Sequence, residues 1–300
     1  MPRSVPLVRA LPAAVLLFAG CGGGAPDYTA LRARFQAIAD SAAPAEVAVA
    51  FMNLADSTYI GVNDTVTMHA ASTMKVPVLI ELFRQAEHGR FSLDDSVGVH
   101  TQFTSIADGS TYTLPSETDS EHELYKLAGQ KTTYRDLADR MIQRSSNLAT
   151  NLLIEIVTAD SVEATMHRIG ADGMHVLRGV EDIPAFDRGM NNTTTARALA
   201  RVMEAIARCT VNTQASCDEM IRILKGQEFN DKIPAGLPPG TPIAHKTGNI
   251  TGIDHDAAIV YPPGHSPFIL VVMTHGYAER ADAFAVSADI ARAAWQAAVQ

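Results

Sequence analysis

The chain has 300 residues, of which 47% are hydrophobic and 19% are charged. This balance is typical of a globular protein, and the length suits one large domain or two smaller ones with a sizeable core. The formal net charge is −9, and no run is rich in lysine and arginine. That charge pattern excludes a protein that binds the phosphates of nucleic acid.

The N-terminus has the pattern of a bacterial lipoprotein signal. Two arginines precede an apolar run over 10–19, which is too short to span a bilayer as a mature helix. Small residues precede Cys21, as in a lipobox. We expect a signal peptide over 1–20, lipid on Cys21 and a flexible tether over 21–27. The mature protein would then be exported, periplasmic and lipid-anchored to a bacterial membrane, and plain secretion is the alternative.

Hydrophobic periodicity predicts strands at both ends of the chain and helices in the middle. Residues 28–40 have helical spacing, and the β-rich segments 46–54 and 58–62 can pair as a hairpin. The apolar segment 72–88 is a predicted helix, whereas the polar segment 103–130 is an excursion with little regular structure, over a cleft. Further helices are expected over 132–144, 148–157, 161–169, 195–209 and 218–224.

The chain becomes β-prone again after residue 240. Strands are expected over 242–247, 255–261 and 267–275, before an amphipathic helix over 280–299. The simplest packing is one antiparallel sheet from the N- and C-terminal segments, covered by the terminal helices, with an inserted helical subdomain. This α/β plus all-α domain would span 28–300. Its α/β part is 28–65 and 240–300, its helical part is 66–239, and the active site lies in the cleft between them.

Cysteine usage agrees with export. Apart from Cys21, the chain contains Cys209 and Cys217, which lie close together across a polar segment. In an oxidising compartment they could form a disulfide that closes a small loop, and two free thiols are the alternative. Nothing around them indicates a catalytic thiol.

A first short motif places a serine and a lysine three residues apart, at Ser72 and Lys75. On a helix these residues share a face, so the hydroxyl and the amine can meet. A serine that opens the helix would also lie at the positive end of its dipole, which favours an oxyanion. Lys75 is embedded in apolar residues, where its lowered pKa would let it take the serine's proton. The alternative is a helix-capping serine with a solvated lysine, but an unused buried charge would be costly.

A second motif, Ser145-Ser146-Asn147, follows the predicted helix that ends near residue 144. The Ser145 hydroxyl can relay a proton to a leaving nitrogen, and the Asn147 amide can bind a substrate carbonyl. Taken alone, these residues also fit a polar loop between two helices.

A third motif, Lys246-Thr247-Gly248, ends a predicted strand. Lys246 and Thr247 can hold a substrate carboxylate, and Gly248 would let the substrate approach the strand closely. The backbone N–H groups of Ser72 and Asn249 would form the oxyanion hole.

The sequence contains no pattern typical of a metal or cofactor site. The segment 254–256 (Asp-His-Asp) lies on a predicted strand, where neighbouring side chains point to opposite faces. His245 would point away from Lys246 for the same reason, whereas His255 could reach the cleft.

The three motifs, in this order, resemble those of the class A β-lactamases and the related penicillin-recognising serine hydrolases. The segments 141–153 and 192–195 resemble the family's sequence around the second motif and at the end of its omega loop. The resemblance runs from about residue 28 to the C-terminus. It implies acylation of Ser72 by a β-lactam, ring opening and hydrolysis of the acyl-enzyme. It also implies a monomer that takes a small-molecule β-lactam or peptidoglycan-like acyl donor and needs no cofactor.

The resemblance further implies an omega-loop glutamate that activates the deacylating water, and Glu181 matches it best. The family's Glu-x-x-Leu-Asn is absent, however, because Asp-Ile-Pro-Ala follows Glu181. Asp182 or Asp187 could serve instead, and a merely acidic surface loop is the other alternative. Ser146 replaces the aspartate that braces the second motif in the family.

Three functions follow from these patterns. The leading one is a serine β-lactamase. A D-alanyl-D-alanine peptidase or esterase would use the same residues but form a longer-lived penicilloyl adduct. A catalytically idle envelope-binding lipoprotein is the third, although all three motifs retain their chemical groups.

Overall fold

A five-stranded antiparallel sheet, in the order β2-β1-β11-β10-β9, organises the computed structural model. Its strands are β1 (Glu46–Asn53), β2 (Tyr59–Val62), β9 (Ile243–Ile250), β10 (Ile253–Val260) and β11 (Phe268–His275). β1 pairs with β11 from Glu46↔His275 to Asn53↔Phe268, so the two ends of the chain meet in the middle of the sheet. The prediction of one sheet from the terminal segments is therefore confirmed.

The structure describes Met1 and residues 28–299. The expected cleavage site, Cys21 and the tether lie outside these residues. In the part that is described, no helix is long and apolar enough to cross a membrane.

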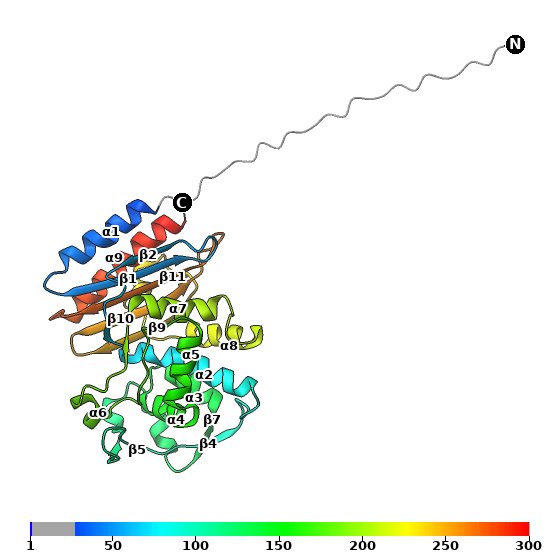
Figure 1. Cartoon of the computed structure of the whole chain (residues 1–300), viewed down its shortest axis with the longest axis vertical. Coiled ribbons are helices and arrows are strands. Elements are labelled where there is room, and N and C mark those ends of the chain that lie inside the picture. Colours follow the sequence, from blue (N-terminus) through cyan, green and yellow to red (C-terminus); the bar gives the residue numbers. More distant parts are fainter. Residues whose placement is uncertain (2–27, 300) are drawn as a thin grey trace.

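Two different cores lie on the two faces of the sheet. Along β1, Val47, Val49 and Phe51 belong to the core that includes α1 (Thr29–Ser41) and α9 (Arg280–Ala298). The alternate β1 residues belong to the larger core of the helical part, because successive side chains of a strand point to opposite faces. Figure 1 shows these layers: α1 and α9 on one side of the sheet, the helical part on the other.

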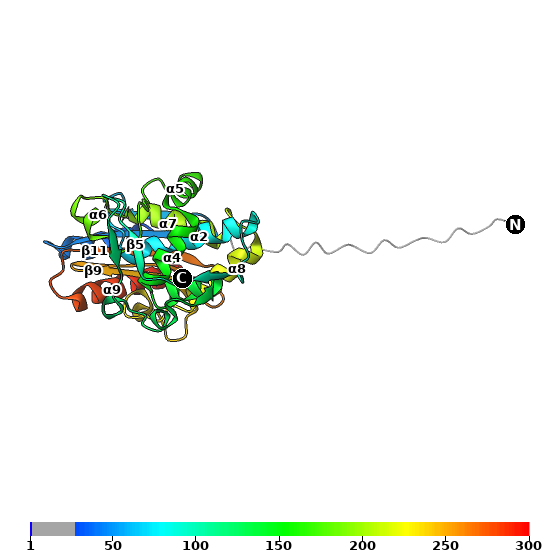
Figure 2. The ribbon, with the colours of Figure 1, turned by 90° about the horizontal axis from the view of Figure 1, so that it is seen from below.

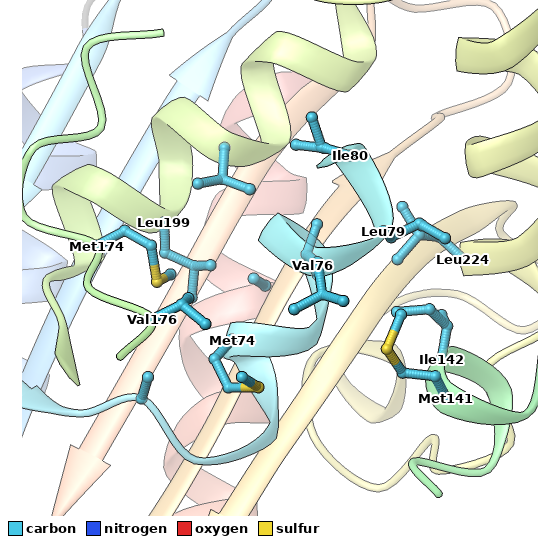
Figure 3. Close-up of a cluster of buried hydrophobic side chains, with 14 of the residues drawn as sticks. Met74, Val76, Leu79, Ile80, Met141, Ile142, Met174, Val176, Leu199 and Leu224 are labelled. Atoms are coloured by element: carbon cyan, nitrogen blue, oxygen red, sulfur yellow. The ribbon is translucent and has the colours of Figure 1, made fainter. Parts of the chain in front are cut away.

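The helical part is built around α2 (Lys75–Glu87), a helix buried along almost its whole length. Most of its residues are apolar, and its buried residues also include the polar Lys75, Glu81 and Gln85. Figure 3 shows Val76, Leu79 and Ile80 of this helix packed among side chains from several surrounding segments. The surrounding helices are α3 (Tyr134–Gln143), α4 (Asn147–Val157), α5 (Ala159–Arg168), α7 (Ala196–Ala207) and α8 (Gln214–Lys225). Figure 2 shows the short α6 (Ile183–Asp187) and α8 at opposite ends of this part.

The segment 103–130 has more regular structure than its sequence predicted. It contains most of the hairpin of β5 (Gln102–Thr104) and β6 (Thr111–Thr113), and two 3-10 turns, Ser116–Thr118 and Leu124–Leu127. Other short pairs join β3 (Met68–His69) to β8 (Thr193–Thr194) and β4 (Ser96–Gly98) to β7 (Lys131–Thr133). A final 3-10 turn, Ile233–Gly236, precedes β9.

The sulfur atoms of Cys209 and Cys217 are bonded, with their Cα atoms 5.7 Å apart. The disulfide links Cys209, which follows α7, to Cys217 in α8. It therefore closes the short loop that the cysteine spacing suggested.

Candidate active site

Ser72 lies in a 3-10 turn, Ala71–Met74, and α2 begins only at Lys75. The expectation that Ser72 opens the α-helix is corrected by this turn, a common form of helix N-terminus. The residue before it, Ala71, has a φ of 46°, in the left-handed region that favours glycine. Its N–H donates to His69 Nδ1 at 3.0 Å, so an imidazole holds the strained backbone beside the nucleophile.

A second histidine connects this turn to the sheet. His255 Nε2 donates to the carbonyl of His69 at 3.0 Å, and the N–H of Thr274 donates to His255 Nδ1 at 3.2 Å. Burial lowers the pKa of His255 to about 4, so this ring is neutral and can accept and donate as described. His255 is fully buried and does not line the cleft, contrary to the sequence-based expectation.

The Ser145 hydroxyl lies between two buried lysine amines. Lys75 Nζ is 3.3 Å from Ser145 Oγ, and Lys246 Nζ is 3.0 Å from it. Lys75 also donates to the Ser145 carbonyl at 2.6 Å, and Lys246 to the Thr247 carbonyl at 2.6 Å. In residues 28–299, Lys75 makes no hydrogen bond to the Ser72 hydroxyl, because acceptors of the second motif surround its amine.

Both amines have a lowered pKa. Burial lowers the pKa of Lys75 to about 7, and the charges of Asp119 and Glu181 oppose part of that shift. Burial also lowers the pKa of Lys246 far below its usual value, and the neighbouring charge of Lys75 adds to the effect. A lysine with a pKa near neutrality can act as a general base at physiological pH.

Asn147 joins Lys75 to Glu181. Its Oδ1 accepts from Lys75 Nζ at 2.9 Å, and its Nδ2 donates to Glu181 Oε1 at 3.1 Å. These two bonds fix the orientation of the amide. The carboxylate of Glu181 is thereby held within the site, close enough for its charge to act on Lys75.

The loop that carries Glu181 is fastened to α4. Asn151 Oδ1 accepts the N–H of Val180 at 2.7 Å, and its Nδ2 donates to the Val180 carbonyl at 3.0 Å. A Cβ at Gly179 would lie 2.5 Å from Asn151 Oδ1, so glycine is required for this approach. Glu181 itself has a φ of 59°, a strained conformation of the kind that recurs at active sites.

The other two candidate bases have different positions. Asp182 caps α6 and is buried, accepting from Ser105 Oγ at 2.7 Å and from the N–H of Ile106 at 3.0 Å. Asp187 is exposed at the end of α6 and does not line the cleft. Glu181 is therefore the carboxylate that this loop presents to Asn147.

A carboxylate from the segment 103–130 braces the second motif. Asp119 Oδ2 accepts the N–H groups of Asn147 and Leu148, each at 2.9 Å, at the start of α4. It also accepts from Ser146 Oγ at 3.4 Å and is buried. Asp119 thus supplies the bracing carboxylate that Ser146 lacks, and a negative charge is favourable at a helix N-terminus.

A cleft of about 420 Å³ is lined by Ser72, Ser145, Asn147, Glu181, Thr247 and Asn249, together with other residues. It lies between the helical part and β9, as expected, and the segment 103–130 reaches it through Thr118 and Ser120. Ser72 and Asn249 line the same cleft, as the proposed oxyanion hole requires.

The third motif lies within β9, which continues to Ile250, whereas the sequence predicted a strand end at residue 247. A Cβ at Gly248 would lie 3.0 Å from the backbone nitrogen of Thr73 and 3.1 Å from that of Ser72. The glycine therefore permits β9 to pack against the turn that carries the nucleophile. Whether Gly248 also lets a substrate approach the strand stays a prediction.

The comparison with known proteins agrees with this geometry. The sequence model described as "Beta-lactamase enzyme family" matches residues 30–298. The chain belongs to the β-lactamase enzyme family. The antiparallel sheet with its helical insertion is the class A β-lactamase fold.

Individual relatives are distant. A β-lactamase of Bacillus licheniformis is 30% identical over 186 residues, which cover 60% of this chain and 61% of that enzyme. The solved structure of a β-lactamase from Chitinophaga pinensis is 25% identical, with a TM-score of 0.78 over 90% of this chain and 99% of that one. A mutant of PBP-A, solved as an acyl-enzyme complex with penicillin G, is 24% identical, with a TM-score of 0.76 over 90% of this chain and 96% of that one.

The sequence did not predict two cationic residues that line the cleft. Lys232 and Arg280 both line it, and both contact Asp254 Oδ1, at 3.1 and 2.9 Å. Asp254 lies on β10 and pairs with Asn249 of β9, so these charges lie beside the third motif. Because the three residues are far apart in the chain, only the fold reveals the cluster.

Proposed function

We propose that this member of the family is a serine β-lactamase that acts through an acyl-enzyme on Ser72. One observation carries the proposal: Ser145 Oγ lies 3.3 Å from Lys75 Nζ and 3.0 Å from Lys246 Nζ, beside a cleft that Ser72 and Glu181 also line. A hydroxyl between two proton-exchanging amines is suited to a reaction that moves a proton from nucleophile to leaving group.

Acylation begins when Ser72 Oγ attacks the β-lactam carbonyl and Lys75, in its neutral form, takes the hydroxyl proton. The backbone N–H groups of Ser72 and Asn249 bind the oxyanion. As the ring C–N bond breaks, the Ser145 hydroxyl gives a proton to the ring nitrogen and regains one from Lys75. Lys232 and Arg280, which line the cleft beside the third motif, favour a substrate carboxylate there.

Deacylation needs one water. Glu181 accepts a proton from that water, whose oxygen attacks the ester carbonyl, and the proton passes to Ser72 Oγ as the ester bond breaks. The bond from Asn147 Nδ2 holds the carboxylate at the site. The product is the ring-opened acid, and the enzyme returns to its starting state.

A penicillin-binding peptidase or esterase with slow deacylation is the second candidate. It is favoured by the residue four positions after Glu181, where the family's asparagine is replaced by the buried Ala185. In that case the amide of Asn147, which already donates to Glu181, would help to order the water without the family's asparagine.

Mass spectrometry of the intact protein, followed in time after mixing with benzylpenicillin, tests the proposal. We expect an adduct with the mass of the whole drug that disappears as the drug is consumed. Ser72→Ala should form no adduct, and Glu181→Gln should accumulate it. A lasting adduct in the parent would favour the second candidate, and no adduct would reject both in favour of an idle lipoprotein. We also propose export and anchoring through lipid on Cys21, from the sequence pattern alone.

A further inference from the structure

Glu181 has a strained backbone, and each of its two neighbours in the chain is held by a different part of the fold. Its φ of 59° is a conformation that a residue other than glycine keeps only where the surrounding structure imposes it. Val180, the residue before it, is bonded through both backbone groups to Asn151 of α4. Asp182, the residue after it, is bonded to the hairpin of β5 and β6. The direction of the Glu181 carboxylate therefore depends on both supports.

The bonds between Asp182 and the hairpin are buried. Asp182 Oδ1 accepts from Ser105 Oγ at 2.7 Å, and Oδ2 accepts the N–H of Ile106 at 3.0 Å. Oδ1 also accepts the N–H of Ala185 at 3.1 Å, which caps α6. Asp182 is 1% exposed and Ser105 is 2% exposed, so these charge-assisted hydrogen bonds do not compete with bulk water. Asp182 thus joins the start of α6 firmly to the hairpin.

The hairpin contacts the same loop at two other points. Tyr112 Oη donates to the Val180 carbonyl at 3.4 Å, before the strained residue. Arg188, which follows α6, donates to the Ala107 carbonyl and forms an ion pair with Asp108 at 3.2 Å. β5 and β6 form a two-stranded sheet of their own, next to α6 (Figure 1). The hairpin therefore supports the whole loop, from the residue before the glutamate to the end of α6.

We propose that Ser105 and Asp182 are positioning residues for deacylation, through which the hairpin directs the Glu181 carboxylate at the attacking water. The inference rests on the proposed function and adds a support to it that lies outside the reacting groups. Ser105 does not line the cleft, so it acts through its neighbours and not on the substrate. Acylation relies on Lys75 and Ser145 and does not need this support. A weakened hairpin contact should consequently slow only the second half of the reaction.

The test measures acylation and deacylation separately, by rapid-quench mass spectrometry of the intact protein after mixing with benzylpenicillin. Ser105→Ala removes one hydrogen bond to Asp182 and changes no charge. We expect it to slow the loss of the adduct about tenfold and to leave its formation unchanged, because a small misplacement of a catalytic group has an effect of this size or larger. Thr104→Ala is the matched control: it removes a hydroxyl from the preceding residue, which is exposed, and should keep both rate constants of the parent.

The Glu181→Gln variant shows whether the effect passes through Glu181. Adding Ser105→Ala to Glu181→Gln should slow deacylation no further, because the two changes remove the same function. Equal slowing in the two backgrounds, or a Ser105→Ala variant that deacylates like the parent, would overturn the inference. A parallel fall in both rate constants, with a lower midpoint of thermal unfolding, would also overturn it and indicate a purely structural role. In the parent, no adduct, or an adduct that persists, would instead reject the proposed function, and the inference with it.

Discussion

Acylation of Ser72 should slow as the pH falls below 7, because the proposed reaction requires Lys75 without its extra proton. Burial lowers the pKa of this amine to about 7, so about half the molecules hold the neutral form at that pH. About one in eleven would hold it one unit lower, and about one in a hundred two units lower. The acylation rate constant should fall in the same proportion, roughly tenfold per unit.

Stopped-flow mixing of the Glu181→Gln variant with a chromophoric cephalosporin measures this constant between about pH 5 and pH 8, the range in which the neutral fraction changes most. The variant isolates acylation, because its acyl-enzyme should persist. Loss of the Glu181 charge should also lower the pKa of Lys75, so the fall in rate should begin at a lower pH in the variant than in single-turnover experiments on the parent. Lys75→Arg is the control, since a guanidinium keeps its proton throughout the range and should give a low, flat profile. Circular dichroism at each pH confirms that the fold is intact.

Two results would refute the reasoning. A rate constant that varies less than twofold over this range would remove Lys75 as the base. If the parent shows the expected profile in single-turnover experiments but Glu181→Gln acylates slowly at every pH, the proton goes to Glu181 instead.

Four further outcomes are expected. Asp119→Ala should lower the free energy of unfolding in urea by about 2–4 kcal/mol, because a buried and a part-buried N–H group of α4 lose their acceptor. Glu117→Ala, at an exposed residue, should change it little. His69→Leu should reduce kcat/KM about tenfold, because the Ala71 N–H loses its acceptor. His69→Asn should keep most of kcat/KM, since an amide oxygen can accept the same hydrogen bond. Equal losses in the two variants would contradict this role. Between about pH 6.5 and pH 4, His255 binds a proton in the unfolded state but not in the folded state. The free energy of unfolding should therefore fall by about 3 kcal/mol as the pH is lowered across that range, and by less in His255→Gln. Cys21→Ala should move the protein from the membrane to the soluble fraction of cells, and an unchanged distribution would argue against lipidation.

The elements that carry the three motifs could be predicted because their signals are local. The apolar segment 72–88 predicted most of α2, and the β-prone segments 255–261 and 267–275 predicted most of β10 and β11. The first motif lies at the start of α2, the second between α3 and α4, and the third on β9. A sheet joining both ends of the chain then followed from the position of the strands.

The remaining features depend on contacts between distant segments. The polarity of 103–130 gave no hint that Asp119 would cap α4, because the carboxylate and its partners are far apart in the chain. The sequence also gave no sign that Gly248 packs against the turn that carries Ser72, because these segments are far apart in the chain. In the sequence, Glu181 is one of three candidates for the base that activates water. The two hydrogen bonds between the Asn151 side chain and the Val180 backbone, which hold its loop against α4, can be seen only in the fold.

The pairing of β1 with β11 has a consequence for how the chain is made. β1 is among the first segments to leave the ribosome and β11 among the last, so the middle of the sheet stays open until synthesis is nearly complete. A polypeptide released before residue 268 would expose β1, whose residues 47–53 are buried in the finished protein, as a free edge. Premature termination should therefore yield an aggregating fragment rather than a smaller working enzyme.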